Sequence, residues 1–191
     1  SSVQVYSVEI EGTTATLLTP GASRLASAAM GAGLFRARAE AARTIERHSR
    51  TKVWQAAAEV KRWREWNSTF EVMAVHGEAG KDPCKSIQDG ALFRIRSRWG
   101  DGRTDESEEQ MVRQVPGRVL HWRFAGLPRW LLAADHYLLF QDVSGGVLVR
   151  SWEEFVGPLA LVLRWLGYIP KISDGFADFL RALQAHLDSM E

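Results

Sequence analysis

The sequence predicts an α+β fold in which a curved antiparallel sheet of about seven strands packs around one long C-terminal helix. Apolar residues near the end of the chain recur at helical spacing, and strand-like segments joined by short turn signals precede them. Two short helical segments stand between the first core strand and the other strands. This order is typical of a single domain whose sheet wraps around its last helix.

Residues 1–33 are expected to form an N-terminal extension to this domain. Val3–Leu18 reads as a β-hairpin that turns at Glu11-Gly12, and such a hairpin can add to a sheet edge of its own or another chain. Residues 19–33 are rich in Ala, Gly and Ser, which suits a loose helix and a linker equally well. We therefore expect residues 34–191 to form the main domain, with a homodimer through the extension as one assembly that the hairpin allows.

The main domain begins with a strand around Thr44-Ile45-Glu46, followed by short helices over residues 51–59 and 61–66. Turn signals at Asp101-Gly102, Pro116-Gly117 and Gly145-Gly146 then separate segments rich in β-formers, and short turns imply antiparallel neighbours. The predicted strands are Thr69–Val75, Leu92–Trp99, Asp105–Val115, Val119–Ala125, Asp135–Val143 and Val147–Val156.

The last helix carries one apolar stripe, which must lie on another element. The stripe consists of Ile172, Phe176, Phe179, Leu180, Leu183 and Leu187. A sheet curled around such a helix often leaves part of the enclosed space unfilled, and that space can become a ligand cavity.

Composition excludes several classes of function. The chain has 191 residues, and 46% of them are hydrophobic, which is enough to form a core. Its formal net charge of +1 is too small to attract nucleic acid or anionic membranes electrostatically. No secretory signal is evident, and the apolar run Pro158–Leu166 is too short to span a bilayer. Cys84 is the single cysteine, so no internal disulfide exists, and we expect a reducing, cytoplasmic location.

Motifs for covalent, metal or cofactor chemistry are missing from the sequence. It contains no nucleophile elbow, phosphate-binding loop, dinucleotide fingerprint or pair of Cys or His residues at metal spacing. We therefore expect neither a metal nor a cofactor. Arg94, Arg96 and Arg98 alternate with apolar residues, so they are expected on the solvated face of a strand, where acidic residues of the next strand can pair with them. The acidic residues are Glu106, Glu108 and Glu109.

The order of elements and several local segments resemble the helix-grip fold of the START-like superfamily, which includes the birch-pollen-allergen proteins and the polyketide cyclase/dehydrase family (SRPBCC). The resemblance covers Leu34 to Ser189. It is carried by Val53-Trp54, Trp63–Asn67, Leu120–Trp122, Asp135–Leu138, the Gly145-Gly146 turn, Glu153–Gly157 and the helix from Gly175 to Leu187. It implies an internal cavity for a hydrophobic ligand and, in the cyclase family, cofactor-free cyclisation or dehydration.

Strand parity identifies a candidate acid–base pair. A two-residue turn at Gly145-Gly146 would place Leu138 opposite Glu153 and His136 opposite Phe155. His136 and Glu153 would then be diagonal neighbours on one face, about 7–8 Å apart at the backbone. If that face is the cavity, the two are suited to proton transfer. A register change of one residue would instead bring Glu154 inward, and a hydrogen-bonded core histidine without a catalytic role is the alternative interpretation.

Aromatic residues are expected to shape the cavity. The sequence has eight tryptophans, and core filling is the favoured interpretation for Trp54 and Trp122. In a helix-grip fold, Trp66, Trp130 and Trp165 fall on elements around the cavity mouth, and Asn67 either caps a helix or offers one polar contact. The expected ligand-binding residues are Trp66, Asn67, Phe93, Trp99, Trp122, Trp130, Leu138, Phe140, Phe155, Trp165, Phe176 and Phe179.

Three functions follow from this reading, one of which is that of a partner-binding module acting through the N-terminal extension. The resemblance implies a cyclase or dehydratase of secondary metabolism that acts on a polyketide-like or aromatic molecule, with His136 as the proton shuttle and Glu153 as its partner. The alternative is a non-catalytic carrier or sensor of a lipid or hydrophobic metabolite.

Overall fold

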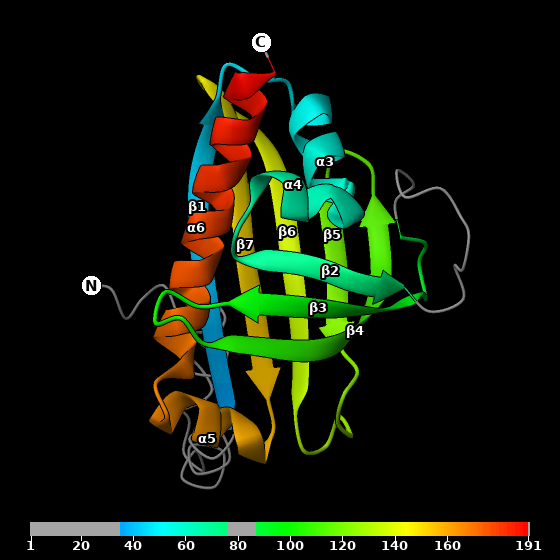
Figure 1. Cartoon of the computed structure of the whole chain (residues 1–191), viewed down its shortest axis with the longest axis vertical. Coiled ribbons are helices and arrows are strands. Elements are labelled where there is room, and N and C mark those ends of the chain that lie inside the picture. The colour runs from blue at the N-terminus through cyan, green and yellow to red at the C-terminus, as the bar shows by residue number, and fades with distance from the viewer. Residues whose placement is uncertain (1–34, 76–86, 191) are drawn as a thin grey trace, which may run out of the picture.

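A computed structural model describes residues 35–75 and 87–190 of the chain. The predicted N-terminal hairpin, the segment 19–33 and the loop residue Cys84 lie outside the described residues. Within them, seven antiparallel strands form one sheet in the order β1-β7-β6-β5-β4-β3-β2 (Figure 1). The α+β class and the curled sheet of about seven strands are therefore confirmed.

The strand boundaries agree with the sequence prediction to within two residues wherever the prediction gave bounds. Period-two alternation and the turn signals are what set these limits. The strands are β1 (Arg36–Glu46), β2 (Phe70–Val75), β3 (Leu92–Arg98), β4 (Thr104–Val115), β5 (Val119–Phe124), β6 (Ala133–Val143) and β7 (Gly146–Val156).

The helices also follow the predicted order. A helix α3 (Arg50–Ala58), a 3₁₀ turn η1 (Val60–Arg62) and a single helical turn α4 (Trp63–Trp66) follow β1. Ser49 caps α3, since its Oγ accepts a hydrogen bond of 3.3 Å from the backbone N–H of Lys52. After β7 come α5 (Pro158–Trp165) and the long helix α6 (Tyr168–Ser189). No helix in the two described ranges combines the length and the apolar character needed to cross a membrane.

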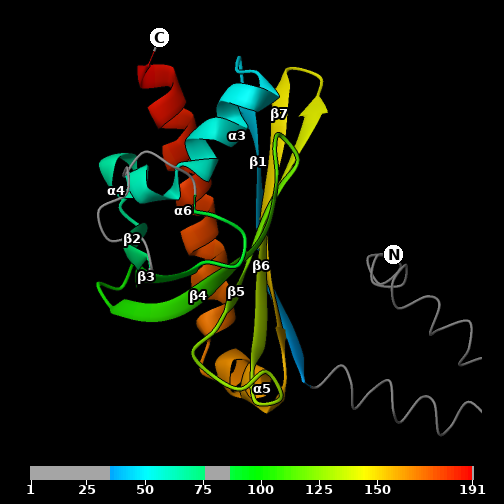
Figure 2. The same ribbon diagram turned by 90° about the vertical axis from the view of Figure 1, so that its right-hand side faces the viewer.

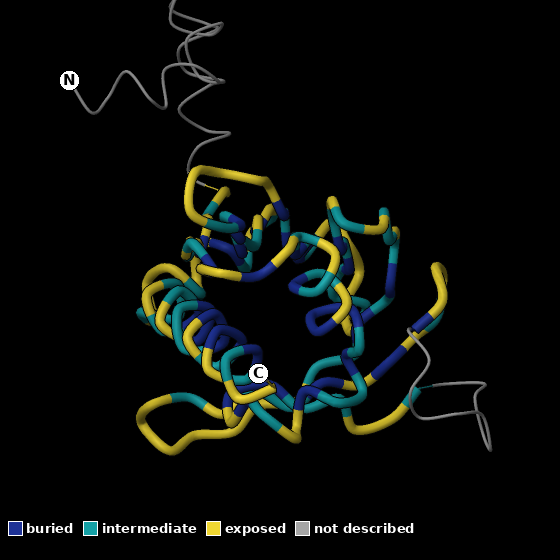
Figure 3. The backbone as a smooth tube through the Cα atoms, turned by 90° about the horizontal axis from the view of Figure 1, so that it is seen from above, coloured by how far each residue is buried: buried dark blue, intermediate teal, exposed yellow. Residues whose placement is uncertain are grey.

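The sheet curls so that its two ends run in different directions. In Figure 1, β2, β3 and β4 cross the direction of β1, β7 and β6 steeply, and Figure 2 shows α6 against the concave side. Viewed from above, the sheet, α3, α4 and α6 surround a common interior (Figure 3). The buried core of the domain lies in this interior.

Helix α6 closes the concave side as its apolar stripe predicts. All six residues of the stripe are buried, and the helix packs mainly against β1. Gln184 adds a polar tie, because its Oε1 accepts a hydrogen bond of 2.8 Å from the backbone N–H of Glu46. Gly175 lies where α6 meets the Trp99 ring, and a Cβ at this position would be only 2.9 Å from a ring carbon of Trp99. The close approach therefore requires glycine here.

The turn between β6 and β7 differs from the prediction and shifts the register. Val143 pairs with Gly146, so the two turn residues are Ser144 and Gly145 rather than Gly145 and Gly146. Gly145 has the positive φ (91°) that the turn requires. Gly146 already belongs to β7, and a Cβ there would collide with the carbonyl oxygen of Ile45 on β1. The second glycine is therefore explained by close strand packing and not by the turn.

Candidate functional site

A cavity lies between the concave face of the sheet and α6. Its volume is about 180 Å³, which is below the roughly 300–1,000 Å³ typical of pockets for drug-sized ligands. A small molecule, or part of a larger one, therefore suits it best. The aromatic part of its wall consists of Trp63, Phe70, Trp99, Trp122, Phe124, Phe155, Phe176 and Phe179.

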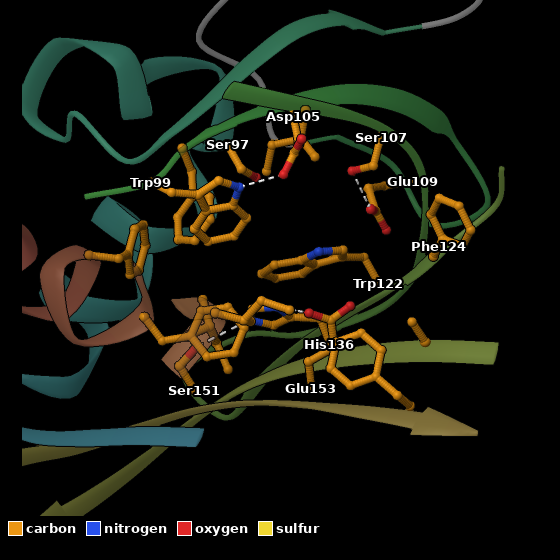
Figure 4. Close-up of a pocket in the computed structure, with 18 of the residues that line it drawn as sticks. Ser97, Trp99, Asp105, Ser107, Glu109, Trp122, Phe124, His136, Ser151 and Glu153 are labelled. Atoms are coloured by element: carbon orange, nitrogen blue, oxygen red, sulfur yellow. Dashed lines mark hydrogen bonds and ion pairs between the residues drawn. The ribbon is translucent and has the colours of Figure 1, made fainter. Parts of the chain in front are cut away.

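Polar groups of the lining project from four strands into the same space (Figure 4). None of the described Lys or Arg residues lines the cavity. The polar lining residues are Ser97 of β3, Asp105, Ser107 and Glu109 of β4, His136 of β6, and Ser151 and Glu153 of β7.

His136 lies at the centre of one cross-strand row. The register places it directly opposite Trp122 on one side and Glu153 on the other, rather than opposite Phe155 as the sequence predicted. The predicted face was correct, because a shift of two residues preserves the parity of a strand. The Nδ1 atom of His136 is 4.0 Å from Oε2 of Glu153.

The His136 ring is held from several sides. It stacks on the indole of Trp122 with 4.1 Å between ring centroids, and the ring of Phe176 meets it edge-on at 4.5 Å. Its Nε2 atom is 3.1 Å from Oγ of Ser151. The imidazole therefore has one fixed orientation, as a proton-transferring group requires.

The protonation states of the pair diverge for one physical reason. Burial disfavours the charged form of both groups, so the pKa of His136 falls to about 3 while the pKa of Glu153 rises well above its usual range. The nearby carboxyl of Glu109 raises the pKa of Glu153 further. Burial thus shifts the two pKa values in opposite directions, each toward the uncharged form of its group.

Glu109 is a second buried carboxyl that the sequence reasoning placed on the wrong face. Only 7% of the residue is exposed, its side chain points into the cavity, and Ser107 Oγ donates a hydrogen bond of 2.7 Å to Oε1. Burial raises the pKa of Glu109 to about 8. The apolar Met111, two residues along β4, has the same parity and was the signal that could have identified this face.

The outer face of these strands is as predicted for the other charged residues. Arg96 forms an ion pair of 2.8 Å with Glu106, and Arg94 lies opposite Glu108 in the register. Arg98 pairs instead with Glu71 of β2 at 2.5 Å. The basic cluster is thus balanced by acidic neighbours and is no separate anion site.

Trp99 and Asp105 form a polar edge to the cavity. The indole Nε1 of Trp99 donates a hydrogen bond of 2.6 Å to Oδ2 of Asp105, and the ring rests against Gly175 of α6. Asp105 itself is exposed. The pair therefore connects the enclosed space to the surface.

The structure brings eight of the predicted site residues to the cavity. The aromatic and aliphatic residues among them contribute wall, and the remaining two form the pair described above. The eight are Trp99, Trp122, Leu138, Phe155, Phe176, Phe179, His136 and Glu153.

Six other predicted residues do not line the cavity. Phe93 and Phe140 are buried in the surrounding core. Trp130 of the β5–β6 loop and Trp165 at the end of α5 are 75% and 83% exposed. The apolar character of these residues therefore did not show which of them line the cavity, which are buried in the core and which lie on the surface.

Trp66 and Asn67 have structural contacts instead. Trp66 stacks on His186 of α6 with 5.2 Å between ring centroids. The Oδ1 atom of Asn67 accepts hydrogen bonds of 2.8 and 2.9 Å from the backbone N–H groups of Thr69 and Phe70, which shapes the turn into β2. Of the two roles considered for Asn67, the structure shows helix capping, because Asn67 is the C-cap residue of α4 and its backbone N–H donates a hydrogen bond of 2.8 Å to the carbonyl oxygen of Trp63.

In the described part of the chain, no group of three or more His, Cys, Asp or Glu side chains is arranged to hold a metal ion.

Comparison with known proteins gives a fold and a set of distant relatives. The chain matches no protein-family model. It is 24% identical over 148 residues to "Oxopyrrolidines biosynthesis cluster protein O" of Penicillium oxalicum, an alignment that covers 64% of this chain and 73% of that protein.

Solved structures give the same picture. The di-domain ARO/CYC protein StfQ of the steffimycin biosynthetic pathway has a TM-score of 0.60 and 14% identity over 84% of this chain. The di-domain ARO/CYC protein BexL of the BE-7585A pathway has a TM-score of 0.60 and 13% identity over 95% of this chain. This chain spans little more than half of each, 55% of StfQ and 59% of BexL.

Protein NE0264 of Nitrosomonas europaea is covered over 95% of its length, with a TM-score of 0.57 and 11% identity. At such identities the likeness concerns the fold alone. The chain has the helix-grip fold that its resemblance to the START-like superfamily predicts.

Proposed function

We propose that this chain binds a small aromatic or polyketide-like molecule in its cavity and catalyses a cofactor-free cyclisation or dehydration in secondary metabolism. The observation that carries the proposal is the arrangement of His136 and Glu153, which are 4.0 Å apart within walls that are mostly aromatic. Aromatic walls favour flat ligands, and a buried base next to a buried acid favours proton transfer.

The proposed reaction uses the two groups in their neutral forms. His136 accepts a proton from a carbon next to a carbonyl group, and Glu153 gives its proton to the departing hydroxyl group. Water leaves, a double bond forms, and the imidazolium returns its proton to the Glu153 carboxylate. In a cyclisation by carbon–carbon bond formation, the same acid would protonate the alkoxide that forms when the enolate attacks a second carbonyl group.

The shape of the cavity also contributes to catalysis. A flexible chain that is held with its reacting carbons in contact gains rate because the entropy of ordering it has already been lost on binding. The rings of Trp122, Phe155 and Phe176 are placed to hold such a chain against His136. The limited volume favours a ligand that forms one small ring at a time.

The comparisons support the biological setting. The fungal relative carries a name that refers to an oxopyrrolidine biosynthesis cluster, and StfQ and BexL come from biosynthetic pathways. A role in secondary metabolism agrees with both.

Substitution of the pair tests the reaction. Small molecules that copurify with the His136→Ala variant would be identified by mass spectrometry and incubated with the wild-type protein. We expect a product that is one water lighter or a cyclised isomer, and no turnover by His136→Ala or Glu153→Gln although both still take up the ligand. His121→Ala on the outer face of the neighbouring strand β5, and Glu154→Gln on the outer face of β7, serve as matched controls and should keep full turnover.

A carrier would give a different result. If the copurified molecule is unchanged by the wild-type protein and all four variants bind it equally, the catalytic proposal is wrong and the cavity serves transport or sensing.

A further inference from the structure

The titratable groups that line the cavity are mostly carboxyl groups. Asp105, Glu109 and Glu153 contribute three carboxyl groups, whereas no Lys or Arg of the described residues faces the space. The remaining titratable group, His136, is neutral because burial lowers its pKa. A ligand that carries a carboxylate or phosphate would find no positive partner here.

Glu109 has an oxygen that is free to bind a ligand. Ser107 donates to Oε1, while Oε2 has no hydrogen-bond partner among residues 35–75 and 87–190. The residue is more than nine-tenths buried, and its carboxyl group points into the cavity (Figure 4). Oε2 is not fully enclosed by protein atoms, so it is accessible from the cavity and can accept a hydrogen bond from a ligand.

The Trp122 ring adds a second attraction near the same place. Its indole lies between His136 and the side chain of Glu109 in Figure 4, and His136 covers one of its faces with 4.1 Å between ring centroids. Indole is the side chain that attracts cations most strongly through its face. Carboxyl group and aromatic surface thus favour the same type of ligand group.

We propose that the natural ligand carries a protonated amine and that Glu109 binds this amine by an ion pair inside the cavity. The inference rests on the proposed function only in requiring that the cavity holds a ligand, and it requires no particular reaction. The ammonium group would supply the positive charge that the buried carboxyl lacks, while the aromatic walls hold the apolar part of the ligand.

Binding should be linked to pH through Glu109. Because the pKa of Glu109 in the free protein is about 8, its carboxyl group is protonated at neutral pH, and pairing with an ammonium group favours loss of this proton. The titratable groups that face Glu109 are Asp105 from β4, His136 from β6 and Glu153 from β7, and β3, β5 and α6 face it with uncharged residues. Affinity for an amine should therefore rise between pH 6 and 8, by at most about tenfold per unit.

Three probes with the same ring separate charge from shape. Phenethylamine, 2-phenylethanol and phenylacetate would be titrated into the full chain by calorimetry at several pH values. We expect phenethylamine to bind about ten- to a hundredfold more tightly than 2-phenylethanol, as for a hydrogen bond to a charged group, and phenylacetate to bind most weakly.

Variants of β4 assign the effect to one residue. Glu109→Gln keeps the size and the Ser107 hydrogen bond but should lose most of the preference for phenethylamine and its pH dependence. Glu109→Asp keeps the carboxyl group and should retain the preference for phenethylamine. It provides a second test if Glu109→Gln proves too unstable to study. Glu108→Gln, the adjacent carboxyl on the outer face, should behave as wild type.

The outcomes distinguish the two proposals. If wild type binds 2-phenylethanol as tightly as phenethylamine, or if Glu109→Gln leaves the affinity for phenethylamine unchanged, the amine inference is wrong while the cavity remains a ligand site. If none of the three probes binds, the cavity does not accept a small aromatic ligand, and both proposals fail.

Discussion

His136 and Glu153 face each other on neighbouring strands with 4.0 Å between Nδ1 and Oε2, and burial favours the uncharged form of both groups. A charged pair in the same position would have to overcome the loss of hydration of two ions. The neutral pair avoids this cost and can still exchange a proton. The pair can therefore be buried in an apolar cavity without the cost of removing two ions from water, and it can still transfer a proton.

The stability of the protein should fall as the pH rises from 6.5 to 8. Glu109 and Glu153 have raised pKa values in the folded state, so they keep protons that the unfolded chain releases above pH 4.5. Glu109, with a pKa of about 8 in the folded state, makes unfolding easier by up to about 1.4 kcal/mol per pH unit in this window, and the raised pKa of Glu153 acts in the same direction. Urea unfolding of wild type and the Glu109→Gln/Glu153→Gln double variant would measure the two slopes.

The double variant should show a nearly flat profile over that range. His136 does not interfere, because above pH 6.5 its imidazole is neutral in both the folded and the unfolded state. Equal slopes for the two proteins would mean that these carboxyl groups are ionised in the folded state.

His136 itself should remain neutral under mildly acidic conditions. Burial lowers its pKa to about 3, so its ring nitrogen shifts in NMR spectra should not change between pH 7 and 5. The unfolded chain gains a proton below pH 6.5, so the contribution of this residue to stability declines as the pH falls from 6.5 toward 3. A titration midpoint above pH 6 would contradict the buried, neutral imidazole.

Replacement of Gly175 by alanine should destabilise the protein, although alanine normally favours a helix by about 0.5–1 kcal/mol over glycine. The new Cβ would lie 2.9 Å from the Trp99 ring, and overpacking of this type costs about 1–3 kcal/mol. Displacement of the ring should also weaken the Trp99–Asp105 hydrogen bond. Thermal unfolding and tryptophan fluorescence would measure both effects, with the exposed neighbour Asp174→Ala as the control.

Removal of residues 1–33 tests the predicted assembly through the N-terminal hairpin. We expect the full chain to form a dimer and the shortened chain, which keeps every described strand and helix, to be monomeric. Light scattering coupled to gel filtration would give both masses. If the full and the shortened protein contain the same number of chains per particle, strand addition by the hairpin is not the basis of any dimer.

The fold could be predicted because local sequence signals identify each segment as a strand or a helix. Alternation and turn glycines define the strands, and the stripe from Ile172 to Leu187 defines α6. The register at β6–β7 could not be predicted, since the sequence does not say that Gly146 is needed for contact with Ile45 of β1 rather than for the turn.

The site was predicted in part for the same reasons. Parity placed His136 and Glu153 on one face, and it does so in every register that differs by two residues. Glu109 was missed because three acidic residues within four positions were all assigned to the outer face, although the parity that Glu109 shares with the apolar Met111 marks it as the one that turns inward. The exposure of Trp130 and Trp165 depends on whether distant segments cover them, and periodicity carries no such information.

The cross-strand row that holds His136 has a consequence for how this protein could be altered. Trp122, His136 and Glu153 all line the cavity and occupy consecutive positions across three strands, and the pairing of these strands fixes their spacing. Exchanging residues within this row would change the chemistry offered to a guest molecule while the scaffold stays intact. The row is thus the natural starting point for engineering a new reaction into the domain.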